Sequence, residues 1–244
     1  MCGIAGIFNL HRDQEIAQRT LEQMIEIVRH RGPAGFGFYR DGHVGLAHAR
    51  LSIIDLEGGW QPIFNEDKTV CIVFNGEIFN YLELREILEN KGHRFATKSD
   101  TEVIIHLYEE FGAECLAHLN GQFAFAIWDK RSTRLFIARD RVGIRPLFYT
   151  SVSGSFLFAS EIKSLFADQR VKRELDPFAL DQIFTFWMTI PPRTAFQGIS
   201  ELPAGHYLII ENGRIEQKKY WDLDFTPAGR VETEEHYAEK LREL

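Results

Sequence analysis

A cysteine stands directly behind the initiator methionine of this 244-residue chain, in Met1-Cys2-Gly3-Ile4. Once Met1 is removed, the Cys2 thiol and a free α-amino group belong to the same residue. Their reference pKa values, about 8.5 and about 7.7–8.0, lie close together, so the amine can accept the thiol's proton near neutral pH. Nucleophile and base then share one residue. Taken alone, Cys2 reads better as a small apolar residue at a frayed chain end, so its assignment depends on the rest of the chain.

Apolar periodicity indicates the elements that hold Cys2 in place. Ile4 to Phe8 is typical of a short buried strand, which would fix the terminus. Leu21, Met24, Ile25 and Val28 follow at helical spacing. The segments 36–39 and 44–49 are predicted to form a hairpin across the turn pair Asp41-Gly42.

Polar residues follow a second buried strand, predicted over Val70 to Phe74, in Asn75-Gly76-Glu77. The pairs Asn80/Glu83 and Ser99/Glu102 have capping-box spacing and predict two helices. Asp100 is therefore expected in the first turn of the second helix.

The rest of the chain supplies more strands than helices. Further expected elements are strands at 121–129, 133–139 and 156–158, a short helix at 160–165, a helix after Asp176-Pro177 with Leu180, Ile183, Phe184 and Trp187 on one face, and a hairpin of 206–211 with 214–219. Runs of strands interrupted by paired helices favour two packed sheets with helices outside. Apolar density falls after Trp221, 227–230 is expected to be a linker, and a helix begins at 234–244, which predicts a truncation inside a larger protein.

Composition excludes several classes of function. The net charge of -7 and the pI near 5.7 argue against a nucleic-acid or anionic-membrane surface. We find neither a transmembrane-length apolar run nor a signal peptide. The three cysteines, Cys2, Cys71 and Cys115, form no C-x-x-C pair, which fits a reducing cytoplasm. The nine histidines lack H-x-x-x-H spacing, so no metal site is expected.

Together these segments resemble the N-terminal glutaminase domain of glutamine-hydrolysing asparagine synthetase, a class II glutamine amidotransferase. The resemblance covers the chain to about Trp221. Its motifs are Met1-Cys2-Gly3-Ile4, His30-Arg31-Gly32-Pro33, Arg50-Leu51-Ser52-Ile53-Ile54-Asp55, Asn75-Gly76-Glu77-Ile78, Ser99-Asp100-Thr101-Glu102, Arg139-Asp140 through Pro146-Leu147, and Leu202-Pro203-Ala204-Gly205. Related amidotransferases for glucosamine phosphate and phosphoribosyl pyrophosphate carry threonine-arginine-tryptophan where this chain has Ala49-Arg50-Leu51, which favours the asparagine synthetase branch.

The resemblance implies roles for eight residues. Cys2 is the expected nucleophile, with Asn75 and Gly76 supplying an oxyanion hole. The substrate-binding residues implied are Arg50, Leu51, Ile53, Asn75, Gly76, Glu77 and Asp100. Arg50 can fork two hydrogen bonds to the α-carboxylate of glutamine, while Glu77 and Asp100 can take its α-ammonium. In isolation, Arg50 reads as a surface ion pair, Asp100 as a helix-start carboxylate and Asn75-Gly76 as a turn pair.

The implied fold is α+β, the four-layer αββα N-terminal nucleophile hydrolase sandwich of two mainly antiparallel sheets. The implied amidotransferase domain spans 1–221, followed at 222–244 by a linker and the start of a truncated C-terminal synthetase domain. L-Glutamine is the expected substrate, with no metal or cofactor in this part of the chain. ATP and Mg²⁺ are expected in the missing synthetase domain. A homodimer is left open.

The implied function is hydrolysis of glutamine to ammonia and glutamate through a γ-glutamyl thioester on Cys2. The ammonia would feed an ATP-dependent synthetase domain, with aspartate as the first expectation for its acceptor. A cell-surface sugar or a secondary metabolite is an alternative acceptor, and a non-catalytic glutamine-binding domain is a second alternative. One residue departs from the family pattern: Ala34 stands where aspartate usually follows Arg-Gly-Pro, in a loop expected to close over glutamine.

Overall fold

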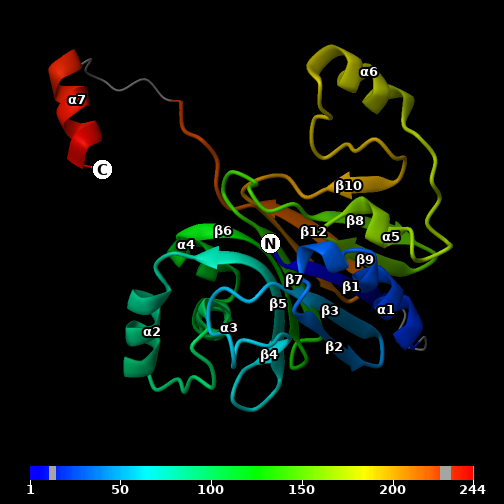
Figure 1. Cartoon of the computed structure of the whole chain (residues 1–244), viewed down its shortest axis with the longest axis horizontal. Coiled ribbons are helices and arrows are strands. Elements are labelled where there is room, and N and C mark those ends of the chain that lie inside the picture. Colours follow the sequence, from blue (N-terminus) through cyan, green and yellow to red (C-terminus); the bar gives the residue numbers. More distant parts are fainter. Residues whose placement is uncertain (11–14, 226–231, 244) are drawn as a thin grey trace.

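Two six-stranded sheets lie face to face in the computed structural model, which describes residues 1–10, 15–225 and 232–243 (Figure 1). The first sheet contains, in spatial order, β10 (Ile199–Glu201), β8 (Phe148–Val152), β9 (Ser155–Ala159), β1 (Gly3–Asn9), β3 (Val44–Arg50) and β2 (Gly35–Asp41). The second contains β12 (Arg214–Lys219), β11 (His206–Glu211), β7 (Arg134–Arg139), β6 (Gly121–Asp129), β5 (Val70–Ile78) and β4 (Ile63–Phe64). The pairs of neighbouring strands are antiparallel.

Helices cover the outer face of each sheet. The first sheet carries α1 (Gln18–Glu26) and α5 (Ile162–Leu165). The second carries α2 (Tyr81–Asn90), α3 (Asp100–Phe111) and α4 (Cys115–His118). The expected α+β sandwich with αββα layering is therefore confirmed. The remaining helical elements are the 3-10 turns η1 (Arg29–Arg31) and η2 (Gly112–Glu114), and the helices α6 (Pro177–Phe186) and α7 (Glu234–Glu243).

The strands at the centre of the sandwich are buried on both faces, because each sheet lies between a helical layer and the other sheet. In β1, Ile4 and Phe8 point into the core between the sheets, whereas Ala5 and Ile7 point toward α1. This explains why β1 reads as a continuous apolar run. Burying each large side chain of this kind stabilises the fold by about 1.5–3 kcal/mol.

Two sequence expectations about β5 and its neighbours are wrong. Asn75 and Gly76 do not follow the strand but lie inside it, since the ladder to β6 continues from Val70 to Ile78. Neither predicted capping box forms. The Asn80 side chain caps no amide of α2 and instead pairs with the backbone of His118 and Asn120.

The second capping box is replaced by a different arrangement around α3. Ser99 does cap the helix by accepting a hydrogen bond from the Thr101 N–H. Glu102, however, accepts from the N–H groups of Ala96 and Thr97 rather than from Ser99. Asp100 lies in the first turn, as expected.

The apolar face predicted for α6 is partly exposed. Asp176 caps this helix at Phe178 and Ala179, as its sequence indicates. Leu180 and Ile183 are half-buried, yet Phe184 and Trp187 are 85% and 93% exposed, so only part of this face is covered. The expected linker at 227–230 lies outside the described residues, and the helix expected near the end is α7. No helix in the described ranges is long and apolar enough to cross a membrane.

Candidate functional site

The site is the polar end of the core between the two sheets, and strand alternation puts it there. Val44 and Leu46 of β3 face this core, so His48 and Arg50 face the same way. On β5, Cys71 and Val73 face it, and Asn75 is next in that series. The same alternation on β1 carries Cys2 onto the face of Ile4 and Phe8.

All eight residues that the sequence singles out line one pocket at this end: Cys2, Arg50, Leu51, Ile53, Asn75, Gly76, Glu77 and Asp100. The fold therefore brings together the residue before β1, the end of β3 with the segment that follows it, the last part of β5 and the first turn of α3. Met1 lines the same pocket. The pocket assembles the groups, whereas their roles remain predictions.

The Cys2 side chain contacts two backbone groups of Leu51. Its Sγ accepts a hydrogen bond from the Leu51 N–H at 3.3 Å and lies 3.6 Å from the Leu51 carbonyl oxygen. Burial raises the pKa of the Cys2 thiol, with the Leu51 hydrogen bond acting in the opposite direction. Burial also lowers the pKa of the terminal amine, which in this chain belongs to Met1. The thiol is thus fixed in place but mainly protonated at neutral pH.

An arginine anchors the Cys2 backbone. Arg31 donates from Nε to the Cys2 carbonyl oxygen at 2.9 Å and from Nη1 to Glu161 at 3.0 Å. Burial works to raise the pKa of Glu161, but hydrogen bonds from Arg31, Lys163 and His30 lower it to about 2. Glu161 is therefore ionised at neutral pH and holds Arg31 against the terminus.

The loop before β2 packs closely on β3. A Cβ at Gly32 would lie 2.2 Å from the Ala49 carbonyl, so only glycine fits there. The Ala34 N–H donates to the Arg50 carbonyl oxygen at 3.0 Å. The loop is thereby tied to the strand end that carries Arg50.

The edge of β5 opposite β6 presents a row of backbone N–H groups, because β4 ends at Phe64 and covers only the start of β5. Phe74 donates its N–H to Gln61 Oε1 at 2.6 Å, and Ile78 donates its N–H to Asp100 Oδ2 at 3.0 Å. The Gly76 N–H lies between them on the same edge, since alternate residues of a strand point their amides the same way. This edge of Gly76 lines the pocket.

Gly76 is also required by packing. A Cβ there would lie 2.2 Å from the Gln122 carbonyl oxygen on β6. Beside it, the Asn75 side chain is fully buried, and neither its Nδ2 nor its Oδ1 has a hydrogen-bond partner among the described residues. Unpaired buried amides are costly, so this one is well suited to bind a ligand's oxygen.

Arg50 and Asp100 provide opposite charges in the pocket. Arg50 is buried, stacks its guanidinium 4.6 Å from the centre of the Trp60 ring and donates from Nη2 to the Asp55 carbonyl oxygen at 2.5 Å. Its Nη1 has no partner in the described part of the chain. Burial raises the pKa of Asp100, and the negative charge of Glu77 acts in the same direction. A bound cation would favour the ionised carboxylate.

Several residues that line the pocket were not predicted from the sequence, and three of them are polar side chains close to the predicted ones. His48 lies two residues before Arg50 on β3, and burial lowers its pKa to about 3, so it is neutral. Arg145 reaches Glu77 at 3.7 Å, and Gln61 holds the Phe74 N–H. The alternation of β3 could have indicated His48. Gln61 and Arg145 come from loops, whose positions no periodicity reports.

Comparison with known proteins identifies the domain. The family model described as "glutamine amidotransferase domain" matches residues 1–221. The chain is 43% identical to asparagine synthetase [glutamine-hydrolyzing] 1 of Bacillus subtilis over 238 residues, covering 96% of this chain and 37% of that protein. It is 41% identical to the amidase chyE of Penicillium rubens, covering 92% of this chain and 34% of that protein. The chain thus spans just over a third of the length of these relatives.

Solved structures agree on the fold. The glutamine phosphoribosylpyrophosphate amidotransferase of B. subtilis superposes with a TM-score of 0.67 at 21% identity, over 90% of this chain and 49% of that one. At this identity the likeness bears on architecture alone, the N-terminal nucleophile hydrolase sandwich. Family match, identity and fold lead to one conclusion: this chain belongs to the glutamine amidotransferase domain family.

Proposed function

We propose that this domain hydrolyses the side-chain amide of L-glutamine at Cys2 and releases ammonia for use elsewhere in a larger protein. The observation that carries the proposal is the pocket, in which a fixed thiol faces an unpaired buried amide, an unpaired guanidinium nitrogen and a carboxylate. Each chemical group of glutamine has a partner there. The family match and the names of the relatives support the same reaction.

The covalent steps use the Cys2 residue twice. Its thiolate attacks the amide carbon, and the carbonyl oxygen becomes an oxyanion that accepts hydrogen bonds from Asn75 Nδ2 and the Gly76 N–H. The C–N bond then breaks, and the nitrogen takes the proton that the thiol gave to the amine, leaving as ammonia. Water adds to the γ-glutamyl thioester, the C–S bond breaks, and glutamate leaves with the thiol restored.

The proton acceptor in this scheme is the α-amine of Cys2, which is free only after Met1 is removed. Met1 also lines the pocket and is 53% exposed. Its removal would therefore both free the base and widen access to the thiol. We propose that the mature domain begins at Cys2.

The remote groups of glutamine set its orientation. Arg50 Nη1 can donate to the α-carboxylate, and the Asp100 carboxylate can accept from the α-ammonium, with Glu77 adding negative charge. Leu51 and Ile53 complete the wall beside Cys2. Fixing both charged ends in this way directs the side-chain amide toward Sγ.

The proposed reaction needs no nucleotide, and this gives the deciding experiment. Material whose intact mass shows loss of Met1 is expected to release glutamate and ammonia in equal amounts without ATP or Mg²⁺. Material that retains Met1 is expected to be inactive. The measurement is amino-acid analysis with coupled ammonia detection. Binding of glutamine without hydrolysis would favour a non-catalytic domain, and strict dependence on ATP would contradict the proposal.

The acceptor of the ammonia lies outside this chain. We propose aspartate, with asparagine as product of a full-length protein that uses ATP and Mg²⁺ in its synthetase part. The comparable identity to an amidase keeps another acceptor, such as a secondary metabolite or a cell-surface sugar, as the alternative. The full-length protein assayed with aspartate separates the two, whereas this chain alone is expected to form no asparagine.

Arg50→Ala and Asp100→Ala are each expected to raise the KM for glutamine, with a smaller effect on kcat. Each change leaves one charged end of the substrate without its partner, which costs on the order of 1.5–3 kcal/mol, roughly a tenfold to hundredfold loss of affinity. Arg50→Lys keeps the positive charge but loses the two-pronged hydrogen bonding of the guanidinium, so its KM should lie between those of the parent and Arg50→Ala. Steady-state kinetics measures this. A fall in kcat at unchanged KM would contradict a role in holding the substrate ends.

A further inference from the structure

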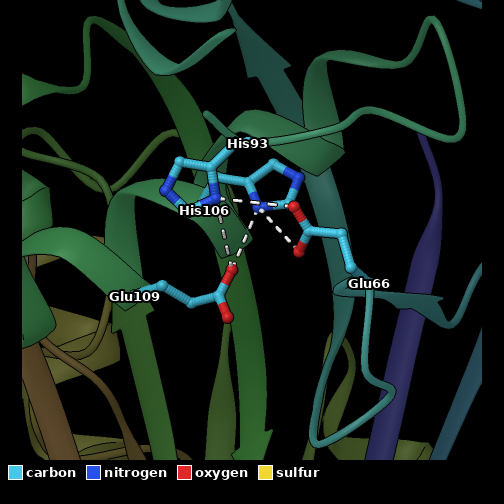
Figure 2. A group of neighbouring side chains, drawn as sticks. All are labelled: Glu66, His93, His106 and Glu109. Atoms are coloured by element: carbon cyan, nitrogen blue, oxygen red, sulfur yellow. Dashed lines mark hydrogen bonds and ion pairs between the residues drawn. The ribbon is translucent and has the colours of Figure 1, made fainter. Parts of the chain in front are cut away.

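Four side chains converge on the outer side of the second sheet, away from the glutamine pocket (Figure 2). Glu66 comes from the turn after β4, His93 from the turn after α2, and His106 and Glu109 from α3. One nitrogen or oxygen from each lies within 4.8 Å of the others. The sequence contains no H-x-x-x-H pattern that would predict this cluster, because the packing of two turns against α3 brings its residues together.

The nitrogen and oxygen atoms that face one another in this cluster, including both oxygens of Glu66, are spaced to suit a small tetrahedral cation. The Nδ1 atom of His106 lies 3.0 Å from Glu109 Oε2 and 3.8 Å from Glu66 Oε2. The Nδ1 atom of His93 lies 3.8 Å from the same Glu109 oxygen and 3.7 Å from Glu66 Oε1. Tetrahedral zinc bonds of about 2.0–2.2 Å require ligand atoms roughly 3.3–3.6 Å apart. These four distances, from 3.0 to 3.8 Å, bracket that range, and one ligand atom from each residue lies within 4.8 Å of the others, so side-chain rotations that draw the atoms inward would close the site.

Each imidazole has a further carboxylate near its outer nitrogen, and the one beside His93 is within hydrogen-bond distance. The Nε2 atom of His93 lies 3.2 Å from Glu110 Oε1, and that of His106 lies 3.8 Å from Glu102 Oε1. For His93, such a carboxylate–histidine pair places the ring proton on Nε2, which leaves its Nδ1 free for a metal. His106 is fully buried, and its Nε2 has no hydrogen-bond partner among the residues described.

The two inward carboxylates are likewise held by their surroundings. Glu109 Oε1 accepts from Asn65 Nδ2 at 2.6 Å, which leaves Oε2 facing the histidines. Glu66 Oε1 accepts from the Arg94 N–H at 2.9 Å, which leaves Oε2 facing His106. Glu66 is partly exposed, so an ion can reach the cluster from its side.

We propose that Glu66, His93, His106 and Glu109 bind one zinc ion as a closed, structural site. Two imidazoles and two carboxylates form a nitrogen and oxygen set that zinc accepts in tetrahedral geometry. Binding displaces the proton that joins His106 Nδ1 to Glu109 Oε2, and that proton goes to solvent. The ion links both turns to α3, whose first turn carries Asp100. The ion would stabilise the position of α3 from the side away from the pocket, and it takes no part in the covalent steps.

The competing explanation is an ion-pair network that needs no metal. A zinc titration distinguishes the zinc site from the ion-pair network. The protein is treated with a chelator and carries Cys2→Ala, so that the Cys2 thiol cannot bind the ion. We expect one equivalent of zinc, measured by competition with a chromophoric chelator and by elemental analysis. We also expect zinc to raise the Tm by several degrees, since it binds only the folded state.

The variants His93→Gln and Glu109→Gln are expected to weaken zinc binding by tenfold or more and to lose the Tm increase. The matched controls His118→Gln and Glu86→Gln, exposed residues outside the cluster, should bind as the parent does. Cobalt(II) supplies a readout that does not depend on stability: the expected spectrum shows strong tetrahedral d–d bands without a thiolate charge-transfer band. Zinc binding unchanged in both cluster variants, or absent from the folded parent, overturns the proposal, as does a thiolate band in the cobalt spectrum.

Discussion

Cys2→Ala is expected to abolish glutamine hydrolysis, with a loss of roughly a thousandfold or more, because it removes the thiol that we propose as the nucleophile. The fold should persist, because Cys2 is only partly buried and its side chain makes only sulfur hydrogen bonds to the Leu51 backbone. Ammonia release and a circular-dichroism spectrum measure the two halves of this expectation.

Cys115→Ala is the matched control for that experiment. Cys115 is buried among the helices that cover the second sheet, away from the pocket, so its loss should leave hydrolysis intact at some cost in stability. Hydrolysis near the parent rate in Cys2→Ala would show that another group is the nucleophile.

The same thiol sets a pH dependence. Burial raises the pKa of Cys2, so the reactive thiolate is the minor form at neutral pH and its fraction grows as pH rises. We therefore expect kcat/KM to increase from about pH 6 to about pH 9, the range that spans the reference values of the amine and the thiol. A rate that falls over this interval would contradict thiolate attack.

Asn75→Ala is expected to lower kcat by about a hundredfold to a thousandfold, the usual loss for one oxyanion-hole donor. The KM should change little, because the bond to the carbonyl oxygen strengthens as negative charge develops there. The buried, unpaired amide of Asn75 also means that its removal relieves an unsatisfied polar group, so the fold should not suffer.

Asn80→Ala serves as the control for Asn75→Ala, because Asn80 pairs with the backbone of His118 and Asn120 and lies outside the pocket. Its kcat should match the parent. A change confined to the KM in Asn75→Ala would replace the oxyanion role by a plain binding role.

Periodicity predicts the sandwich well because its strands are buried on both faces and its hairpins carry strong turn residues. The β1 run and the Asp41-Gly42 turn are examples. The same logic misplaces Asn75-Gly76, since this pair usually marks a turn, whereas here the ladder to β6 overrides that local preference. Tertiary pairing, not propensity, decides where β5 ends.

The spacing of residues along the sequence predicts the lining of the proposed glutamine pocket better than it predicts the proposed zinc site. Arg50 and Asn75 lie on strands, and Cys2 directly precedes one, so strand alternation indicates the direction of each side chain. His93 and Glu66 come from turns, and only the packing of those turns against α3 brings them to His106. The exposed face of α6 shows the converse error: Phe184 and Trp187 have the pattern of a buried face without burial in this domain.

The early end of β4 has a consequence for solubility. A strand edge with free amides is a template on which another chain can add a strand and start aggregation. Here Gln61 and Asp100 accept hydrogen bonds from the N–H groups of Phe74 and Ile78, as a neighbouring strand would, and the Gly76 N–H between them is the one that we propose binds the substrate. Asp100 thus protects the edge of the sheet in addition to its proposed role of binding the substrate's ammonium. Under this proposal, protection against aggregation and substrate binding depend on the same carboxylate.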